Sequence, residues 1–392
     1  MILKLIKTTT AATAAAWSAL WTFPAILLSS FIIAWAAEAA QFLIAQGLAL
    51  AILAWLQTLP EFAVEAVIAW QAGKDPSKTH LAIANFTGSL RLLVGLGWPM
   101  IYFVAAAFGW KREHRFITVQ LDDEHSVEVF GLFLPIAYFT FIWWKGSLTV
   151  WDAIPLIASY VLYLFILWKI PPRDDEGEAL EDLGVVPRAI LKLSPKKRNT
   201  AIWVLFFAGG AILFFAAHPF LDSMLAIATS LGVSTFVFVQ WVAPFLSEFP
   251  EKLSAFYWAR KVKTANVALM NMVSSNINQW SILSAMIPIL FAISAGEMRP
   301  LTFDSHQRAE ILLTILQSFL GFLLLLNLQL RMHEALILFV LWLAQFAMPA
   351  WRGPMIYVYL AWCVFELGRL VISGQAPAAW RGLRTTLAER FA

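Results

Sequence analysis

The chain consists of apolar runs of about 20 residues that follow one another from residue 17 to residue 373. A helical run of this length crosses the hydrocarbon core of a bilayer, whereas the strands of a membrane barrel would show alternating stretches of about 10 residues. Hydrophobic residues make up 60% of the 392 residues and charged residues only 14%, against about a quarter in soluble proteins. The sequence therefore predicts an all-α polytopic membrane protein.

The apolar runs predict about eleven spans in two halves. In the first half, residues 17–170, the candidate spans are 17–36, 42–71, 80–108, 128–145 and 150–169. In the second half, residues 200–350, they are 200–217, 224–258, 266–294, 309–328 and 333–350. Residues 1–16 form an N-terminal segment, and residues 351–392 hold an extra span at 354–373 and a tail.

Two polar segments connect the spans. Residues 171–199 carry an acidic stretch followed by a basic one, so we expect a linker on the cytoplasmic side with a short surface helix at 185–193. In residues 116–129, two β-branched alternations flank an acidic turn. That pattern fits either a small hairpin or an ordinary loop.

The distribution of lysine and arginine predicts the orientation. With the N-terminus outside, most basic residues fall in cytoplasmic loops, as the positive-inside rule requires. Examples are Lys111, Arg112 and Arg115 after the third span, and Arg381 and Arg384 in the tail. The C-terminus is therefore expected inside. We expect the protein to lie in the plasma (inner) membrane of the cell.

A short motif occurs once in each half. Gln57-Thr58-Leu59-Pro60-Glu61 is followed by Asn85-Phe86-Thr87-Gly88-Ser89 in the next apolar run, and Ser247-Glu248-Phe249-Pro250-Glu251 is followed by Asn271-Met272-Val273-Ser274-Ser275. A carboxylate deep in a bilayer costs roughly 3 kcal/mol or more. Corresponding apolar segments that are interrupted in both halves point to the binding site of a secondary transporter. In the orientation above, the two copies run in opposite directions.

The repeated motif resembles that of the cation/calcium exchanger superfamily. Each of the two inverted repeats of that family carries Gly-Thr-Ser-x-Pro-Glu and Gly-Asn-x-x-Gly-Ser-Asn, and Gly232-Val233-Ser234 stands where the second repeat often begins. The resemblance implies two inverted five-helix repeats of the sodium/calcium exchanger type plus an extra C-terminal span. It also implies an antiporter that exchanges Na⁺ or H⁺ for Ca²⁺ or another cation by alternating access.

The resemblance also implies which residues bind the ion. Glu61 and Glu251 take the carboxylate positions, where a metal cation would bind. Hydroxyls and amides take the remaining ligand positions, namely Thr58, Ser247, Asn85, Ser89, Asn271 and Ser275. Gln57 and Glu248 replace companion hydroxyl residues, and Leu93 and Gln279 replace an Asn or Asp that the family often has one turn after the serine.

Three charged residues extend or modify this site. Glu248 would share a helix face with Glu251, and two close carboxylates favour binding of a cation or a proton between them. Glu65, one turn after Glu61, either extends the ion path or binds water near the outer mouth. Arg91 lies close to the first motif and could pair with Glu248 or Glu61, which would fill the site without transport.

The alternative function is accordingly a transport-inactive subunit with protein partners in a larger membrane complex. Otherwise the expected partners are membrane lipid and inorganic cations, with bound Na⁺ or Ca²⁺ and no other cofactor. We find no run suited to nucleic acid and no motif of an enzyme active site in the sequence.

Overall fold

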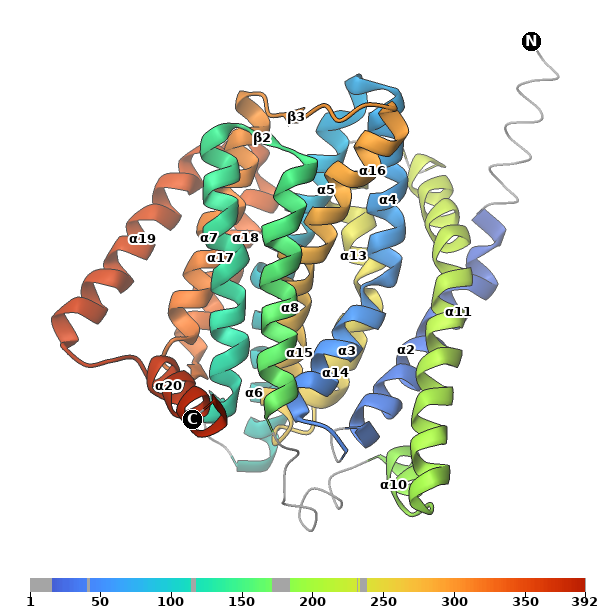
Figure 1. The fold of residues 1–392 in the computed structure, drawn as a ribbon, viewed down its shortest axis with the longest axis vertical. Coiled ribbons are helices and arrows are strands. Elements are labelled where there is room, and N and C mark those ends of the chain that lie inside the picture. Colours follow the sequence, from blue (N-terminus) through green and yellow to red (C-terminus); the bar gives the residue numbers. More distant parts are fainter. Residues whose placement is uncertain are drawn as a thin grey trace.

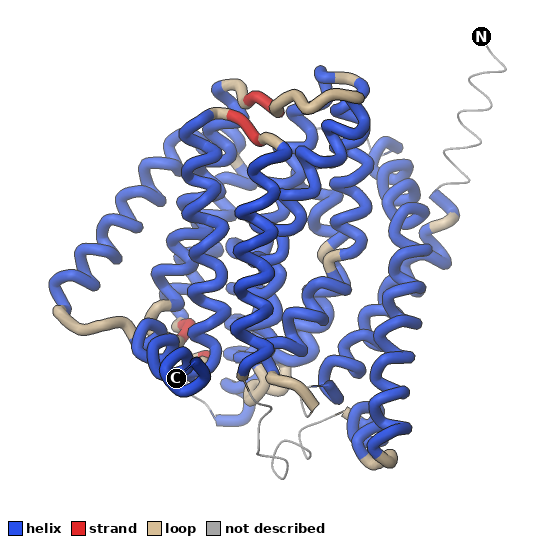
Figure 2. The backbone as a smooth tube through the Cα atoms, in the orientation of Figure 1, coloured by secondary structure: helices blue, strands red, loops and turns tan. Residues whose placement is uncertain are grey.

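The computed structural model describes residues 16–40, 43–113, 118–170, 184–230, 232 and 238–391, and these residues are mostly helical. The long helices run up and down through one bundle, and two short sheets lie at its opposite ends (Figure 1 and Figure 2). The expected N-terminal segment falls almost entirely outside the described residues, as do Val233, Ser234 and residues 171–183 of the linker.

The first half of the chain contains five candidate spans. They are α2 (Ala19–Ala40), the bent pair α3 (Gln46–Gln57) and α4 (Leu59–Lys74), the continuous α5 (Thr79–Leu92), η2 (Leu93–Gly97) and α6 (Trp98–Glu113), then α7 (Ser126–Lys145) and α8 (Ala153–Lys169). Short 3₁₀ turns join them, namely η1 (Pro76–Lys78), η3 (Asp123–His125) and η4 (Val150–Asp152).

The second half repeats this order and adds two helices. It contains α10 (Val185–Leu191), α11 (Pro195–Ser230), η5 (Phe238–Val242) with α13 (Ala243–Ser247) and α14 (Phe249–Ala259), then α15 (Ala265–Asn278), η6 (Gln279–Leu283) and α16 (Ser284–Ala295). These are followed by α17 (Ser305–Leu325), α18 (Met332–Ala347), η7 (Pro349–Trp351), α19 (Arg352–Ser373) and α20 (Ala378–Phe391). Helix α10 confirms the short helix expected in the linker.

The helix that carries the first span of the second half is longer than its apolar run. The sequence predicts a span over residues 200–217, and the part of α11 that is long and apolar enough to cross a membrane is Pro195–Ala216. The helix itself continues through Pro219 to Ser230, and Phe220, just beyond the proline, is fully buried. Its ring centroid is 6.3 Å from that of Phe23 on α2. The described residues of the predicted span 224–258 therefore lie in the last turns of α11 and in η5, α13 and α14.

The two halves are inverted repeats. In Figure 1, the chain rises from α3 to α4 but descends from α13 to α14, and it descends from α5 to α6 but rises from α15 to α16. Equivalent helices therefore cross the bundle in opposite directions, as the sequence predicts.

The short strands join one half to the other. Strand β1 (Val119–Gln120), just before α7, pairs antiparallel with β4 (Gln329–Leu330), just before α18. At the other end of the bundle, β2 (Ser147–Leu148) pairs antiparallel with β3 (Leu301–Thr302). The hairpin alternative for residues 116–129 is thus wrong, since β1 bonds to a strand more than 200 residues away and the 3₁₀ turn η3 begins at Asp123.

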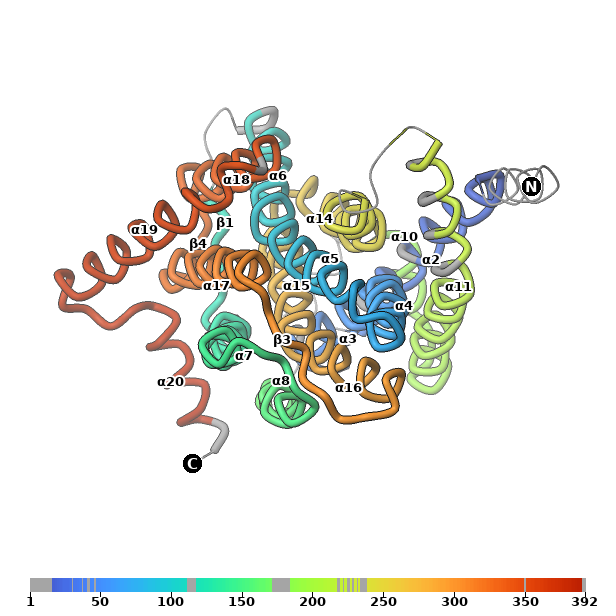
Figure 3. Tube along the Cα trace, turned by 90° about the horizontal axis from the view of Figure 1, so that it is seen from above, coloured from blue at the N-terminus to red at the C-terminus, as the bar shows by residue number. Residues whose placement is uncertain are grey.

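Two pairs of helices flank the central bundle. Figure 3 shows α2 and α11 side by side at one edge, with α19 and α20 at the opposite edge. Large apolar side chains are exposed on the outer helices, for example Phe207 (72%) on α11 and Ile372 (87%) on α19. Soluble monomers rarely expose apolar surface on this scale, so these helices suit contact with lipid.

Labelling of an introduced cysteine can test the predicted orientation. The native sequence has a single cysteine, Cys363, and it is buried, so background reaction should be low. Lys192→Cys, at the exposed end of α10, should react with an impermeant maleimide in inverted vesicles but not in intact cells. Glu297→Cys, on an exposed turn near β3, should show the opposite pattern. Reaction of the Lys192→Cys protein in intact cells would reverse the orientation.

Candidate ion-binding site

Each repeat has one helix that breaks near the middle of the bundle. Helix α3 ends at Gln57 and α4 begins at Leu59, with an angle of 47° between them. In the second repeat, α13 ends at Ser247 and α14 begins at Phe249. In both cases a proline occupies the first turn of the restarted helix, where its missing N–H costs no helical hydrogen bond. The breaks therefore place Glu61 and Glu251 at helix N-termini, where the helix dipole favours negative charge.

The helix that follows each break contains a π-helical turn. Helix α5 continues into η2 at Leu93, and α15 continues into η6 at Gln279. These two residues thus occupy equivalent positions, as the motif alignment predicts. Leu93 adds only apolar surface, whereas the amide of Gln279 reaches the central carboxylates.

Carboxylates from the two repeats meet at one serine. The Ser89 hydroxyl contacts one oxygen of Glu61 and one oxygen of Glu248. The Gln279 amide donates to the other oxygen of Glu61, and its nitrogen lies 3.4 Å from Glu248 Oε1. All four side chains are buried. We call Glu61, Ser89, Glu248 and Gln279, together with Glu251, the central cluster.

Glu251 differs from the other two carboxylates of this cluster. It is fully buried, and neither of its oxygens has a hydrogen-bond partner within the described part of the chain. It is an electrostatic neighbour of Glu61 and lies next to Lys252 in the sequence. On α15, the Ser275 hydroxyl and the amide oxygens of Asn271 and Asn276 also have no partner among the described residues. A buried carboxylate without a hydrogen-bond partner is a favourable position for a cation or a proton.

Further hydrogen bonds connect the broken helices to the opposite repeat. Gln57 donates to the Ser254 hydroxyl (2.6 Å) and accepts from Asn271 (3.2 Å). Asn278 donates to the Thr58 hydroxyl (2.7 Å). Gln57 and Thr58 thus bind the second repeat directly, although Thr58 does not contact the carboxylates in this arrangement.

Two of the expected ligands have their hydrogen-bond partners outside the central cluster. Asn85 donates to Glu65 at 2.6 Å, and both side chains are buried, so an amide binds Glu65 inside the protein. The Ser247 hydroxyl donates to the backbone carbonyl of Pro244 in its own helix (3.3 Å). This bond uses the hydrogen of the Ser247 hydroxyl and leaves its oxygen lone pairs for a cation.

Comparison of the sequence and the fold with known proteins shows the family of this chain. The sequence matches the sodium/calcium exchanger protein family over residues 13–169 and 201–351, which is most of the chain. A crystal structure of the H⁺/Ca²⁺ exchanger CAX superposes with a TM-score of 0.81 at 31% identity, and the alignment covers 95% of this chain and 91% of CAX. The chain belongs to the sodium/calcium exchanger family.

More distant exchangers share the fold. The sodium-calcium exchanger NCX_Mj, in crystals soaked with Na⁺ and Sr²⁺, superposes with a TM-score of 0.63 at 16% identity over 86% of this chain and 98% of that one. A comparison with curated proteins finds no match. Family membership identifies the two five-helix repeats of this exchanger and makes α19 the additional span.

Arg91 does not pair with the central carboxylates of the exchanger. It is fully buried on α5, and its guanidinium forms an ion pair with Glu310 of α17. It also donates to Gln345 of α18 (3.1 Å) and lies 5.1 Å from the centroid of the Trp241 ring. Glu310 in turn accepts from Arg352 (3.0 Å). The expected pairing of Arg91 with Glu61 or Glu248 is therefore wrong, because buried partners on α17 and α18 satisfy its charge.

Lys252 is a site residue that the motifs do not include, and its ammonium forms a buried ion pair with Glu248 one helical turn earlier. The spacing of four residues between Glu and Lys inside an apolar run is the signal for it in the sequence. Glu310 and Gln345 have no such signal, because they lie 219 and 254 residues away from Arg91.

The glycine of the first motif allows a close approach of two helices. A Cβ on Gly88 would lie 2.0 Å from the backbone oxygen of Gln240 on η5. Backbone cannot move as a side chain can, so we expect Gly88→Ala to destabilise the exchanger by about 2 kcal/mol or more. Gly368→Ala on α19, where a Cβ would contact nothing within 4 Å, is the matched control and should be neutral. Thermal unfolding in detergent measures both, and equal midpoints would contradict the prediction.

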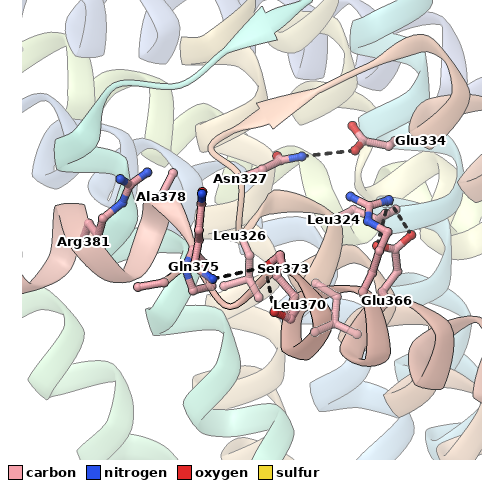
Figure 4. Close-up of a pocket in the computed structure, with 14 residues that line it drawn as sticks. Leu324, Leu326, Asn327, Glu334, Glu366, Leu370, Ser373, Gln375, Ala378 and Arg381 are labelled. Carbon is pink, nitrogen blue, oxygen red and sulfur yellow. Dashed lines mark hydrogen bonds and ion pairs between the residues drawn. The ribbon is translucent and has the colours of Figure 1, made fainter.

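A cavity of about 210 Å³ lies away from the central cluster, where the ends of α17, α19 and α20 meet (Figure 4). Glu366 pairs with Arg369 at its edge (3.3 Å). Asn327 donates to Glu334 there at 3.3 Å. None of the proposed ion ligands lines this cavity.

Proposed function

We propose that this protein is a secondary cation antiporter that exchanges protons for Ca²⁺ or another divalent cation by alternating access. The observation that carries the proposal is the contact of Glu61 and Glu248, from opposite inverted repeats, with the same Ser89 hydroxyl. A site shared by two inverted repeats can open alternately to the two sides of a membrane when the repeats move against each other.

The number of hydrogens available between Ser89, Glu61 and Glu248 favours protons as the counter-ion. A serine hydroxyl has one hydrogen and can donate to only one carboxylate. The contact with the second carboxylate therefore needs a proton on that carboxylate, which then donates to the serine oxygen. Such a shared proton would leave when a cation binds between Glu61 and Glu248.

The oxygen atoms of the cluster suit a hard divalent cation. Calcium takes six to eight oxygen ligands, from carboxylates, amides, hydroxyls and backbone carbonyls. Glu61, Glu248 and Glu251 supply up to six carboxylate oxygens. Ser89 and Ser275 add hydroxyl oxygens, and the asparagines within one turn of them on α5 and α15 add amide oxygens. The resemblance to CAX, an H⁺/Ca²⁺ exchanger, supports the same pair of ions.

The helices flanking the bundle suggest which part moves. Helix α2 of the first repeat packs along α11 of the second, apart from α7, α8 and α17 (Figure 3). We propose that this pair and the broken helices gate the site on alternate sides, while the remaining helices stay in place.

Ion flux in proteoliposomes tests the function. With purified protein in vesicles that are acidic inside, added Ca²⁺ should enter as protons leave, and a fluorescent pH indicator should report the loss of the gradient. An imposed Na⁺ gradient in place of the pH gradient distinguishes proton from sodium coupling. Flux driven only by Na⁺ would correct the counter-ion, and no flux under any gradient would contradict the antiporter.

One observation favours the alternative, a transport-inactive structural subunit. Lys252 already neutralises Glu248, so part of the central charge is bound by the protein itself. Absence of flux together with copurification of a stoichiometric membrane partner would support that function.

A further inference from the structure

Lys252 is a buried lysine next to the proposed ion site. Its side chain is 6% exposed, and its ammonium forms an ion pair with Glu248. The ring of Phe245, on α13 just before the helix break, lies 5.9 Å from the same ammonium. Lysine is almost never buried without a charged partner, so Glu248 is what retains this cation inside the protein.

The two oxygens of Glu248 face different partners. Oε2 binds Lys252, whereas Oε1 contacts Ser89 and Gln279, which also bind Glu61. A cation that enters between Glu61 and Glu248 therefore meets a carboxylate that is already partly neutralised. It must share Glu248 with the ammonium or displace it.

We propose that Lys252 is a tethered cation that competes with the transported ion for Glu248 and so sets the affinity for divalent cations. This inference rests on the proposed function, because it takes the central cluster as the site of the transported ion. A fixed positive charge repels a divalent cation about twice as strongly as a monovalent one at the same distance. Lys252 therefore weakens divalent binding more than proton binding, and it favours release of the divalent ion when protons arrive.

Calcium binding to the purified full chain tests this role. Lys252→Met removes the charge and keeps most of the side-chain volume, so the Kd for Ca²⁺ should fall at least about tenfold. Lys252→Arg keeps the charge and can bind the carboxylate through two parallel hydrogen bonds, so it should compete more strongly and raise the Kd several-fold. Lys145→Met is the matched control. Lys145, at the end of α7, pairs with Asp152 of η4, and removal of this lysine should leave the Kd for Ca²⁺ unchanged.

The order of affinities decides the inference. Tightest binding by the Met variant and weakest by the Arg variant would support it, whereas equal Kd values in native, Met and Arg proteins would overturn it and leave the antiporter intact. If the Met variant does not fold, the comparison of Arg with native decides alone, because a merely structural ion pair predicts no change. Calcium binding by the Met variant but not by the native chain would support the tethered cation and contradict the proposed function. Binding by neither would overturn both.

Discussion

Glu251→Gln should abolish proton-coupled Ca²⁺ flux while the protein stays folded. The substitution removes one negative charge, and it breaks no hydrogen bond of Glu251 to the described residues. Loss of a buried charged partner costs a bound ion about 3–5 kcal/mol, which lowers its affinity by about two to four orders of magnitude. Flux should therefore fall below about 1% of the native rate at a Ca²⁺ concentration near the native half-saturation point.

The same substitution should not lower stability. A buried carboxylate without hydrogen bonds destabilises the folded state, so its neutral isostere should unfold at the same or a higher temperature. Glu297→Gln, on an exposed turn, is the control and should change neither flux nor unfolding. Native flux in the Glu251→Gln protein would exclude Glu251 as an ion ligand. A large fall in its unfolding temperature would instead assign Glu251 a structural role.

Glu310→Gln should strongly destabilise the protein, by about 3–5 kcal/mol, because it leaves Arg91 as an unpaired buried charge. Glu310 also accepts hydrogen bonds from Gln240 on η5 (3.1 Å) and from Arg352 on α19, so its carboxylate connects both of these helices to α17. The double variant Glu310→Gln with Arg91→Met should recover much of the lost stability, because residue 91 then carries no buried charge that needs a partner. Thermal unfolding of the single and double variants in one detergent measures both effects.

An exposed ion pair serves as the comparison for Glu310. The Arg299–Glu297 pair is partly exposed on both sides, and such surface pairs contribute about 0–1 kcal/mol. Glu297→Gln should therefore be nearly neutral for unfolding. If Glu310→Gln were equally neutral, the Arg91 network would not stabilise the bundle. Failure of the double variant to recover stability would show that Glu310 acts mainly through Arg352 and Gln240.

Much of the fold could be read from local patterns. Apolar runs long enough to cross a bilayer specify helices, because a backbone in lipid must satisfy its own hydrogen bonds. Pro60 and Pro250, each followed by a glutamate, mark the positions where two helices break. The matching motifs in each half, with the distribution of basic residues, predicted that the repeats are inverted.

Other features depended on contacts between distant segments. The extension of α11 past Pro219 comes from packing against α2, and β1 finds its partner near residue 330. Neither effect leaves a mark in the local sequence. A boundary at a proline is a reasonable expectation, but tertiary packing can override it.

The same division applies to the candidate site. Residue type and motif position were enough to select Glu61, Ser89, Glu248 and Gln279, because a carboxylate or amide in an apolar run is costly unless it has a use or a partner. Which of them meet could not be read from the sequence. Glu61 reaches Glu248 through Ser89 because the inverted arrangement brings α4, α5 and α14 together in the bundle. Arg91 binds Glu310 because α5 packs against α17, whereas the Lys252–Glu248 pair lies within one turn and has a local signal. A sequence specifies the charges it buries and the pairs that lie one helical turn apart, but only the packing of the helices assigns partners to charges on different helices.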